Sequence, residues 1–178
     1  GFPPTQHIES FDIARAGGLG VTIHAGEAAG LDSIRAAMDD CAADRLGHGV
    51  HLIDDIEERP DGWTIGSVAT EALEQQICLE VCPTSNVHTG ATGTTSFGNH
   101  PVDRLARAGL AVTINTDNRL MSNITLSGEY HRLAEYFGWG VTEFATANAH
   151  ALRTAFCDEE TRRRVSDRLR YGPGATPS

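Results

Sequence analysis

Residues 21–28 read VTIHAGEA, a short apolar run that ends at a histidine, a glycine and a glutamate. Directly behind it, residues 31–41 place apolar side chains at helical spacing. A strand followed at once by a helix is the repeating unit of proteins with a parallel sheet. The stretch therefore predicts a βα unit whose strand presents His24 and Glu27 at its carboxyl end.

The same pattern recurs three more times along the chain. Apolar runs lie at residues 45–47, 77–81 and 111–114, and helical spacing recurs at residues 67–75 and 102–108. This alternation predicts an α/β protein in which four parallel strands are connected by helices.

The two ends of the chain are predicted to be helical. Residues 5–16 form the expected helix before the first strand, with Thr5 as its cap. After the fourth strand, two of the predicted helices begin at residues that favour the cap position, Thr142 and Asp158. The three helices expected there span residues 125–137, 142–156 and 158–169.

A polar residue or segment follows each predicted strand. They are, in chain order, His24, His48, the segment Pro83-Thr84-Ser85, and Asp117. The carboxyl ends of parallel strands are where βα barrels build their active sites. A complete barrel has eight βα units and about 250 residues. This chain supplies four units, so we expect half of a barrel in residues 1–170 and a flexible Gly- and Pro-rich tail in residues 171–178.

The composition excludes several kinds of partner. The chain carries 14 Lys and Arg against 24 Asp and Glu, and a formal net charge of −10 repels nucleic acid and anionic membrane surfaces. Its apolar runs fall far short of the roughly 20 residues that a membrane helix needs. The four cysteines form no CxxC pair, which favours reduced thiols in the cytoplasm. The chain begins with glycine and has no leader, which we interpret as an internal start.

Each polar motif has a structural explanation as well as a functional one. His24 and Glu27 fit a metal ligand beside an acid or base, but also a hydrogen-bonded histidine with a capping glutamate. His48, between two glycines, fits a site residue or a tight packing position, and Asp117 fits a metal ligand or a helix cap. Their occurrence at successive strand ends favours one shared site. The remaining internal histidines are assigned to packing or the surface: His51, His88, His100, His131 and His150.

The motifs also resemble a known family. Four segments are similar, in order and spacing, to the signature segments of adenosine deaminases: VTIHAGEA (21–28), DRLGHGVHL (44–52), LEVCPTSNVHTG (79–90) and VTINTDNRLMS (112–122). The resemblance implies the C-terminal half of a (β/α)8 TIM-type barrel, with its last four strands followed by C-terminal helices. It also implies hydrolytic deamination of adenosine to inosine and ammonia, with deoxyadenosine as a further substrate.

The resemblance implies catalytic and metal-binding roles for four residues. His24 and Asp117 would bind one Zn²⁺ per active site, together with two further ligands in the missing N-terminal half. A zinc-bound water would supply hydroxide near neutral pH. Glu27, in its protonated form, would give a proton to N1 of the purine. His48 would orient the attacking water and take or stabilise its proton.

Three further positions would bind the substrate if the resemblance holds. The Gly26 amide would donate to a purine ring nitrogen. The Ser85 loop would lie near the ribose, although Thr84, Ser85 and Asn86 could equally be turn formers. Asn118 would donate to purine N7. Many family members carry Asp at that position, and an Asn amide donates at any pH.

The resemblance stops at the other half of the metal site. The family's paired metal-binding histidines, separated by one residue, have no counterpart in this sequence. We therefore expect the 178-residue chain alone to be inactive and prone to associate. Two alternatives stay open: deamination of adenine, AMP or a modified nucleoside, and a half-barrel without catalysis. The expected partner is a small-molecule purine nucleoside, and the oligomeric state is left open.

Overall fold

The computed structural model describes residues 3–171 and has one main parallel sheet. Its strands are β1 (Thr22–Ala25), β2 (Arg45–His48), β5 (Cys78–Val81) and β6 (Ala111–Ile114). They lie side by side in the order β1-β2-β5-β6, and every neighbouring pair is parallel. This confirms the predicted α/β class with four parallel strands.

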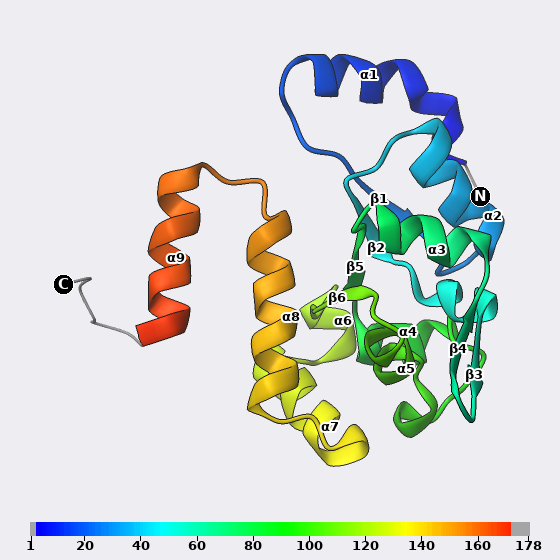
Figure 1. Cartoon of the computed structure of the whole chain (residues 1–178), viewed down its shortest axis with the longest axis vertical. Coiled ribbons are helices and arrows are strands. Elements are labelled where there is room, and N and C mark those ends of the chain that lie inside the picture. Colours follow the sequence, from blue (N-terminus) through cyan, green and yellow to red (C-terminus); the bar gives the residue numbers. More distant parts are fainter. Residues whose placement is uncertain (1–2, 172–178) are drawn as a thin grey trace.

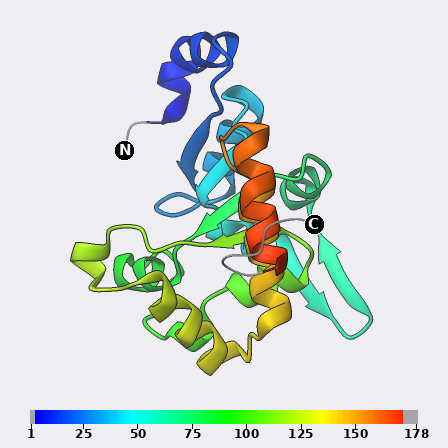
Figure 2. The same ribbon diagram turned by 90° about the vertical axis from the view of Figure 1, so that its left-hand side faces the viewer.

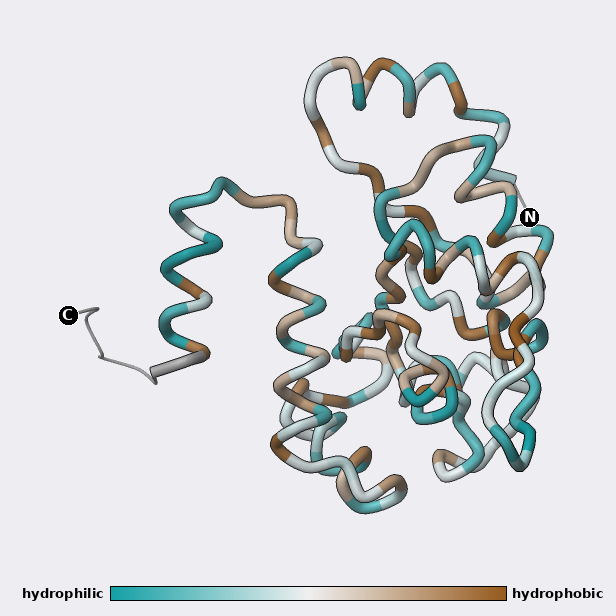
Figure 3. Tube along the Cα trace, viewed as in Figure 1, coloured by the Kyte–Doolittle hydropathy of each residue, from teal (hydrophilic) through white to brown (hydrophobic). Residues whose placement is uncertain are grey.

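Helices surround the sheet and continue beyond it (Figure 1). Helices α2, α3 and α5 lie in the connections between the strands of the sheet. Helix α8 lies beside β6, and α9 lies on the far side of α8 from the sheet. Figure 3 shows α9 as mostly hydrophilic, in keeping with this outer position. The helices span α1 (Ile8–Ala16), α2 (Leu31–Arg35), α3 (Ser67–Glu74), α4 (Pro83–Thr89), α5 (Val102–Arg107), α6 (Arg119–Ser122), α7 (Leu126–Phe137), α8 (Val141–Thr154) and α9 (Glu159–Tyr171).

Two of the three predicted helix caps are wrong. A 3-10 turn at Pro4–His7 precedes α1, whose N-cap is His7 and not Thr5. Helix α8 begins after Gly140, because the Glu143 carboxylate reaches back to accept a hydrogen bond from the Gly140 amide at 2.8 Å. Thr142 therefore lies inside the first turn. The Asp158 cap is confirmed, since its carboxylate accepts a hydrogen bond from the Thr161 amide at 2.7 Å.

Other differences lie in the connecting segments. The helix predicted at residues 31–41 leaves α-helical geometry after Arg35 and continues as a wider π-helical turn at Ala36–Asp40. A hairpin of β3 (Ile56–Arg59) and β4 (Gly62–Ile65) was not predicted, and Figure 2 shows it projecting from the body. Of the predicted tail at residues 171–178, Tyr171 ends α9 and the rest lies outside the described residues.

The apolar core lies between one face of the sheet and the helices that cover it. Leu46 and Leu79 from the sheet are fully buried, as are Ile34 of α2 and Leu105 of α5. Burying such side chains stabilises a fold by about 1.5–3 kcal/mol each. Among residues 3–171, no helix is both long enough and apolar enough to cross a bilayer.

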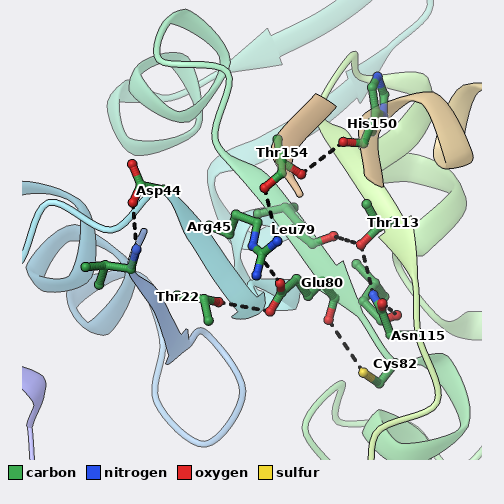
Figure 4. Close-up of polar contacts among 12 residues, drawn as sticks. Thr22, Asp44, Arg45, Leu79, Glu80, Cys82, Thr113, Asn115, His150 and Thr154 are labelled. Carbon is green, nitrogen blue, oxygen red and sulfur yellow. Dashed lines mark hydrogen bonds and ion pairs between the residues drawn. The ribbon is translucent and has the colours of Figure 1, made fainter. Parts of the chain in front are cut away.

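The opposite face of the sheet is polar (Figure 4). Along β1 the burial alternates, so that Thr22 is exposed on this face whereas Ile23 is buried on the other. The Thr22 hydroxyl donates to Glu80 at 2.9 Å, and Arg45 Nε lies 2.9 Å from the same carboxylate as an ion pair, although its N–H is not aimed at the oxygen. In a closed barrel this face would be the interior.

Candidate active site at the strand ends

The sheet brings two predicted histidines together. His24 near the end of β1 is paired with Gly47 of β2, and the next residue of β2 is His48. The centroids of the two imidazole rings are 5.2 Å apart. A Cβ on Gly47 would lie 3.2 Å from both Cα and Cγ of His24, a distance tighter than ordinary contact. The glycine before His48 is therefore needed because the His24 ring lies against it.

Two of the predicted site residues have an unusual backbone conformation. His48 has a φ of 68° and Asp117 a φ of 53°, both in the left-handed region. Side chains other than glycine pay about 1–2 kcal/mol for this conformation. Such strain collects at functional sites, where the surrounding structure holds it in place.

His48 and Glu27 form the centre of the site. His48 Nε2 lies 3.2 Å from Glu27 Oε2, and the Thr89 hydroxyl donates to the other carboxylate oxygen at 3.3 Å. His48 is buried, with 2% of its surface exposed. Burial lowers the pKa of His48 because it disfavours the charged ring, and the nearby Glu27 opposes this effect only in part. A neutral imidazole is therefore favoured at neutral pH.

Asp117 joins the same site from the other end of the sheet. The Ser85 hydroxyl, on the first turn of α4, donates to Asp117 Oδ2 at 2.6 Å. The charges of Asp117 and His24 both act on the pKa of His48, in opposite directions. Polar side chains at the carboxyl ends of four strands therefore lie at the same edge of the sheet. In this structure the Ser85 side chain contacts Asp117. The position of Ser85 near a ribose stays a prediction.

His24 and Asp117 offer the right chemistry for zinc. An imidazole nitrogen and a carboxylate oxygen are both common zinc ligands, and zinc sites use at least three protein ligands. Among residues 3–171, no three His, Cys, Asp or Glu side chains are arranged to hold a metal ion. Cys82 is a poor third ligand, because burial raises the pKa of its thiol to about 12 and zinc binds the thiolate. The two residues fit part of a zinc site.

The Gly26 amide has a hydrogen-bond partner within the protein. Its amide N–H donates to the Ser33 hydroxyl at 2.9 Å, so this donor is already used within the protein. Gly26 has a φ of 66°, and a Cβ there would lie 2.5 Å from Ile34 Cδ1. The glycine is required by the tight turn between β1 and α2, and donation of its amide to a purine stays a prediction.

Asn118 caps helix α6. Its side-chain oxygen accepts a hydrogen bond from the Met121 amide at 3.0 Å and so caps α6. The side-chain NH₂ group is the remaining donor of this exposed residue. A helix cap and a donor to a ligand are therefore compatible at this position.

A cavity of about 520 Å³ adjoins the site. His24 and Glu27 line it together with Pro4 and residues of α2. Its volume is within the range of small-molecule sites, which runs from about 300 to 1,000 Å³. The site therefore has open space beside its polar groups.

Sequence reasoning missed two buried polar residues behind His48. Asn86 has no exposed surface, and its side-chain nitrogen lies 3.0 Å from His48 Nδ1. His100 is 2% exposed, and its Nε2 lies 3.4 Å from the Asn86 side-chain oxygen. Asn86 was interpreted as a turn former and His100 as a packing residue. The adjacency of Asn86 to Ser85 was the available signal, and nothing in the sequence around His100 indicates the contact.

The fold and the site define a class of α/β protein whose polar groups gather at the carboxyl ends of parallel strands, as in barrel hydrolases. The adenosine deaminase family model matches residues 1–171. The chain is 46% identical over 170 residues to an adenosine deaminase of Mycobacterium tuberculosis (strain H37Rv), covering 95% of this chain and 46% of that protein. The chain belongs to the adenosine deaminase family.

Solved structures show the same fold in part of larger proteins. An adenine deaminase from Arthrobacter aurescens matches with a TM-score of 0.83 and 24% identity, over 98% of this chain and 50% of that one. A zinc-bound amidohydrolase from Burkholderia ambifaria matches with a TM-score of 0.78 and 22% identity, over 94% and 44%. The chain spans about half the length of the relatives that it matches.

Proposed function

We propose that a full-length protein containing these residues hydrolyses adenosine, and also deoxyadenosine, with release of ammonia. The observation that carries the proposal is the convergence of Glu27, His48 and the Ser85–Asp117 pair at one end of the sheet. Membership of the adenosine deaminase family supports a deaminase or amidohydrolase reaction for this arrangement.

We propose that residues 1–170 form the C-terminal half of a (β/α)8 barrel. The four-stranded parallel sheet, with β1 and β6 at its two edges, supports this proposal. The polar face that carries Thr22 and Glu80 then becomes the barrel interior. Matches that cover about half of each solved relative agree with it.

His24 and Asp117 would hold one zinc ion in the complete barrel. Zinc bound there would lower the pKa of water and so supply the nucleophile. Ser85 donates to Asp117 Oδ2 and thereby fixes which oxygen of the carboxylate is turned towards the protein. Two protein ligands are fewer than a zinc site uses, so we expect the isolated 178-residue chain not to deaminate adenosine.

Glu27 and His48 would act on the two reacting partners, the purine ring and the water. Glu27, protonated, would donate to N1 of the purine and make C6 more electrophilic. His48, 3.2 Å from Glu27, would orient the water that attacks C6. The proton that the water loses would pass to the amino nitrogen, the bond from C6 to that nitrogen would break and ammonia would leave. The C6 hydroxyl would return a proton to Glu27. The Asn118 NH₂ group would donate to N7 and hold the ring in place.

A second candidate substrate is adenine, because the solved structure with a TM-score of 0.83 is an adenine deaminase. The catalytic groups act on the purine ring and do not depend on the sugar. AMP fits less well, because its phosphate group would need several cations near the site. Arg119 next to Asn118 supplies one positive charge, and the chain as a whole has a formal net charge of −10. A half-barrel without catalysis is disfavoured by the strained backbone at His48 and Asp117.

We propose the cytoplasm as the location, on the basis of the free cysteines.

One assay tests the proposal. The full-length protein is purified, its metal content is measured, and adenosine, deoxyadenosine, adenine and AMP are compared by the ultraviolet change that accompanies loss of the amino group. The proposal predicts the highest kcat/KM for the two nucleosides and about one zinc ion per chain. Preference for adenine would establish the second candidate, and no turnover of any aminopurine by a zinc-loaded protein would refute both.

A further inference from the structure

A buried polar pair lies directly behind His48. Asn86 of α4 has no exposed surface, and His100, which follows the 3-10 turn Phe97–Asn99, is 2% exposed. Buried polar side chains are costly unless every donor meets an acceptor, so the direction of each hydrogen bond in this pair is constrained. The directions follow from one backbone amide, because a backbone N–H can only donate a hydrogen bond.

The first two bonds fix the state of His100. The Val102 amide donates to His100 Nδ1 at 3.1 Å, and a backbone N–H can only donate. Nδ1 therefore carries a lone pair, and the proton of the neutral ring is on Nε2. Burial also lowers the pKa of His100 to about 3, which keeps the ring neutral.

The next two hydrogen bonds determine which nitrogen of His48 carries the proton. His100 Nε2–H faces an Asn86 side-chain atom at 3.4 Å, which must be the carbonyl oxygen because only an oxygen accepts. The other end of the Asn86 amide is then the NH₂ group, and it lies 3.0 Å from His48 Nδ1. His48 Nδ1 accepts this bond, so the single proton of the neutral His48 ring is on Nε2.

Asn86 also reaches the second proposed catalytic residue. Its NH₂ group has two protons, and the nitrogen lies 3.4 Å from Glu27 Oε1 in addition to 3.0 Å from His48 Nδ1. His48 Nε2 faces the other oxygen of the same carboxylate at 3.2 Å. A single buried amide therefore contacts both proposed catalytic residues, Glu27 and His48.

We propose that Asn86, held in orientation by His100, is a positioning residue that fixes His48 as its Nε2–H tautomer and aims Glu27. In this tautomer Nε2 has no lone pair, so His48 meets water or a developing oxyanion as a hydrogen-bond donor and does not accept a proton there. The catalytic consequence depends on the proposed deaminase function, whereas the tautomer is a property of the ring that is measured without turnover.

The test replaces one atom of Asn86. Asn86→Asp keeps the shape of the side chain, and its first oxygen still accepts from His100 Nε2–H. Its second oxygen faces His48 Nδ1 and can only accept, which requires a proton on Nδ1. Asn99→Asp is the matched control, because it makes the same charge change at an exposed position.

The tautomer is read by long-range ¹H–¹⁵N correlation spectra of the full chain with ¹⁵N-labelled histidine, and the His48 signals are assigned with His48→Gln. We expect the Nε2–H form of His48 in the wild type and in Asn99→Asp, and a proton on Nδ1 in Asn86→Asp. In an active preparation Asn86→Asp should lower kcat by about 100-fold with a smaller change in KM, the size typical for loss of an aligned donor. A wild-type His48 with its proton on Nδ1, or an unchanged tautomer in Asn86→Asp, would overturn the proposal.

Variants of His100 give an independent test if Asn86→Asp does not fold. His100→Gln retains an acceptor for the Val102 amide and a donor for Asn86, so the His48 tautomer should be kept. His100→Leu removes the donor, and Asn86 is then no longer held, so the His48 spectrum should show both tautomers. Equal spectra for these two variants would contradict the role of His100. A zinc-loaded full-length protein that is inactive but has the expected tautomer would refute the deaminase proposal alone. An active full-length protein with the opposite tautomer would refute this inference alone.

Discussion

The Ser85 hydroxyl lies 2.6 Å from Oδ2 of Asp117 and joins the segment after β5 to the segment after β6. Ser85 is buried, whereas Asp117 is exposed at the end of its strand. The hydrogen bond restricts the rotation of a carboxylate that would otherwise be free to turn. The pairing therefore gives Asp117 one preferred direction before any metal binds.

Ser85→Ala should weaken zinc binding by about 10- to 100-fold, because loss of a partner that orients a ligand has effects of this size. The measurement is a competition titration of the full-length protein with a chromophoric chelator. Ser67→Ala, at an exposed position at the start of α3, is the control and should leave the affinity unchanged. Equal affinities in Ser85→Ala and the wild type would show that this hydrogen bond does not orient a ligand.

Gly47→Ala should reduce both stability and activity. The added Cβ would lie 3.2 Å from two atoms of His24, so the imidazole must move. Crowding of this kind costs about 1–3 kcal/mol, which a urea unfolding curve measures. At Gly30 a Cβ would meet nothing within 4 Å, so Gly30→Ala should leave turnover intact. Normal turnover in Gly47→Ala would argue against a functional position for His24.

Glu27→Gln should lower kcat by about 100- to 10,000-fold in the full-length protein, the range for loss of a general acid. The amide keeps the shape of the side chain but cannot supply a proton. The affinity for the product inosine, measured as a dissociation constant, should change much less. The exposed Glu9→Gln serves as the control for the loss of one charge. Turnover within threefold of the wild type would exclude Glu27 as the proton donor.

His100 should make stability depend on pH. Its pKa is lowered to about 3 in the folded protein because burial disfavours the charged ring, whereas an unfolded histidine has a pKa of about 6.5. Between these values the unfolded chain binds one more proton, so stability is full above pH 6.5 and falls by up to ~1.4 kcal/mol per pH unit below it. Urea midpoints at pH 7.5 and pH 5 should therefore differ more for the wild type than for His100→Gln. Equal differences would mean that His100 does not titrate on unfolding.

The strands and the strand-end residues could be predicted because strands of a parallel sheet form short apolar runs, and the polar residues after each run mark its carboxyl end. His24, His48 and Asp117 were identified in this way, and β1, β2 and β6 lie where the runs were predicted. Segments without such a run were missed. Helix α4 was interpreted as turn residues, although Pro83 at its first position and Gly90 after its end, with a φ of 74°, are typical helix boundaries.

The hydrogen-bond partners could not be predicted for a different reason. Gly26 was predicted to offer its amide to a ligand, but the fold places the Ser33 hydroxyl within 2.9 Å of it. Asn86 and His100 meet only because the chain turns back between α4 and the 3-10 turn at Phe97–Asn99. Contacts of this kind depend on loop geometry, which residue periodicity does not encode.

In the proposed enzyme, His24 and Asp117 share one zinc ion beside Glu27 and His48. Anomalous X-ray diffraction at the zinc edge, on crystals of the full-length protein, would locate this ion. We expect one zinc peak at about 2.0–2.2 Å from a ring nitrogen of His24 and from a carboxylate oxygen of Asp117. A zinc ion bound to only one of these residues, or a zinc-saturated crystal with no peak between them, would contradict it.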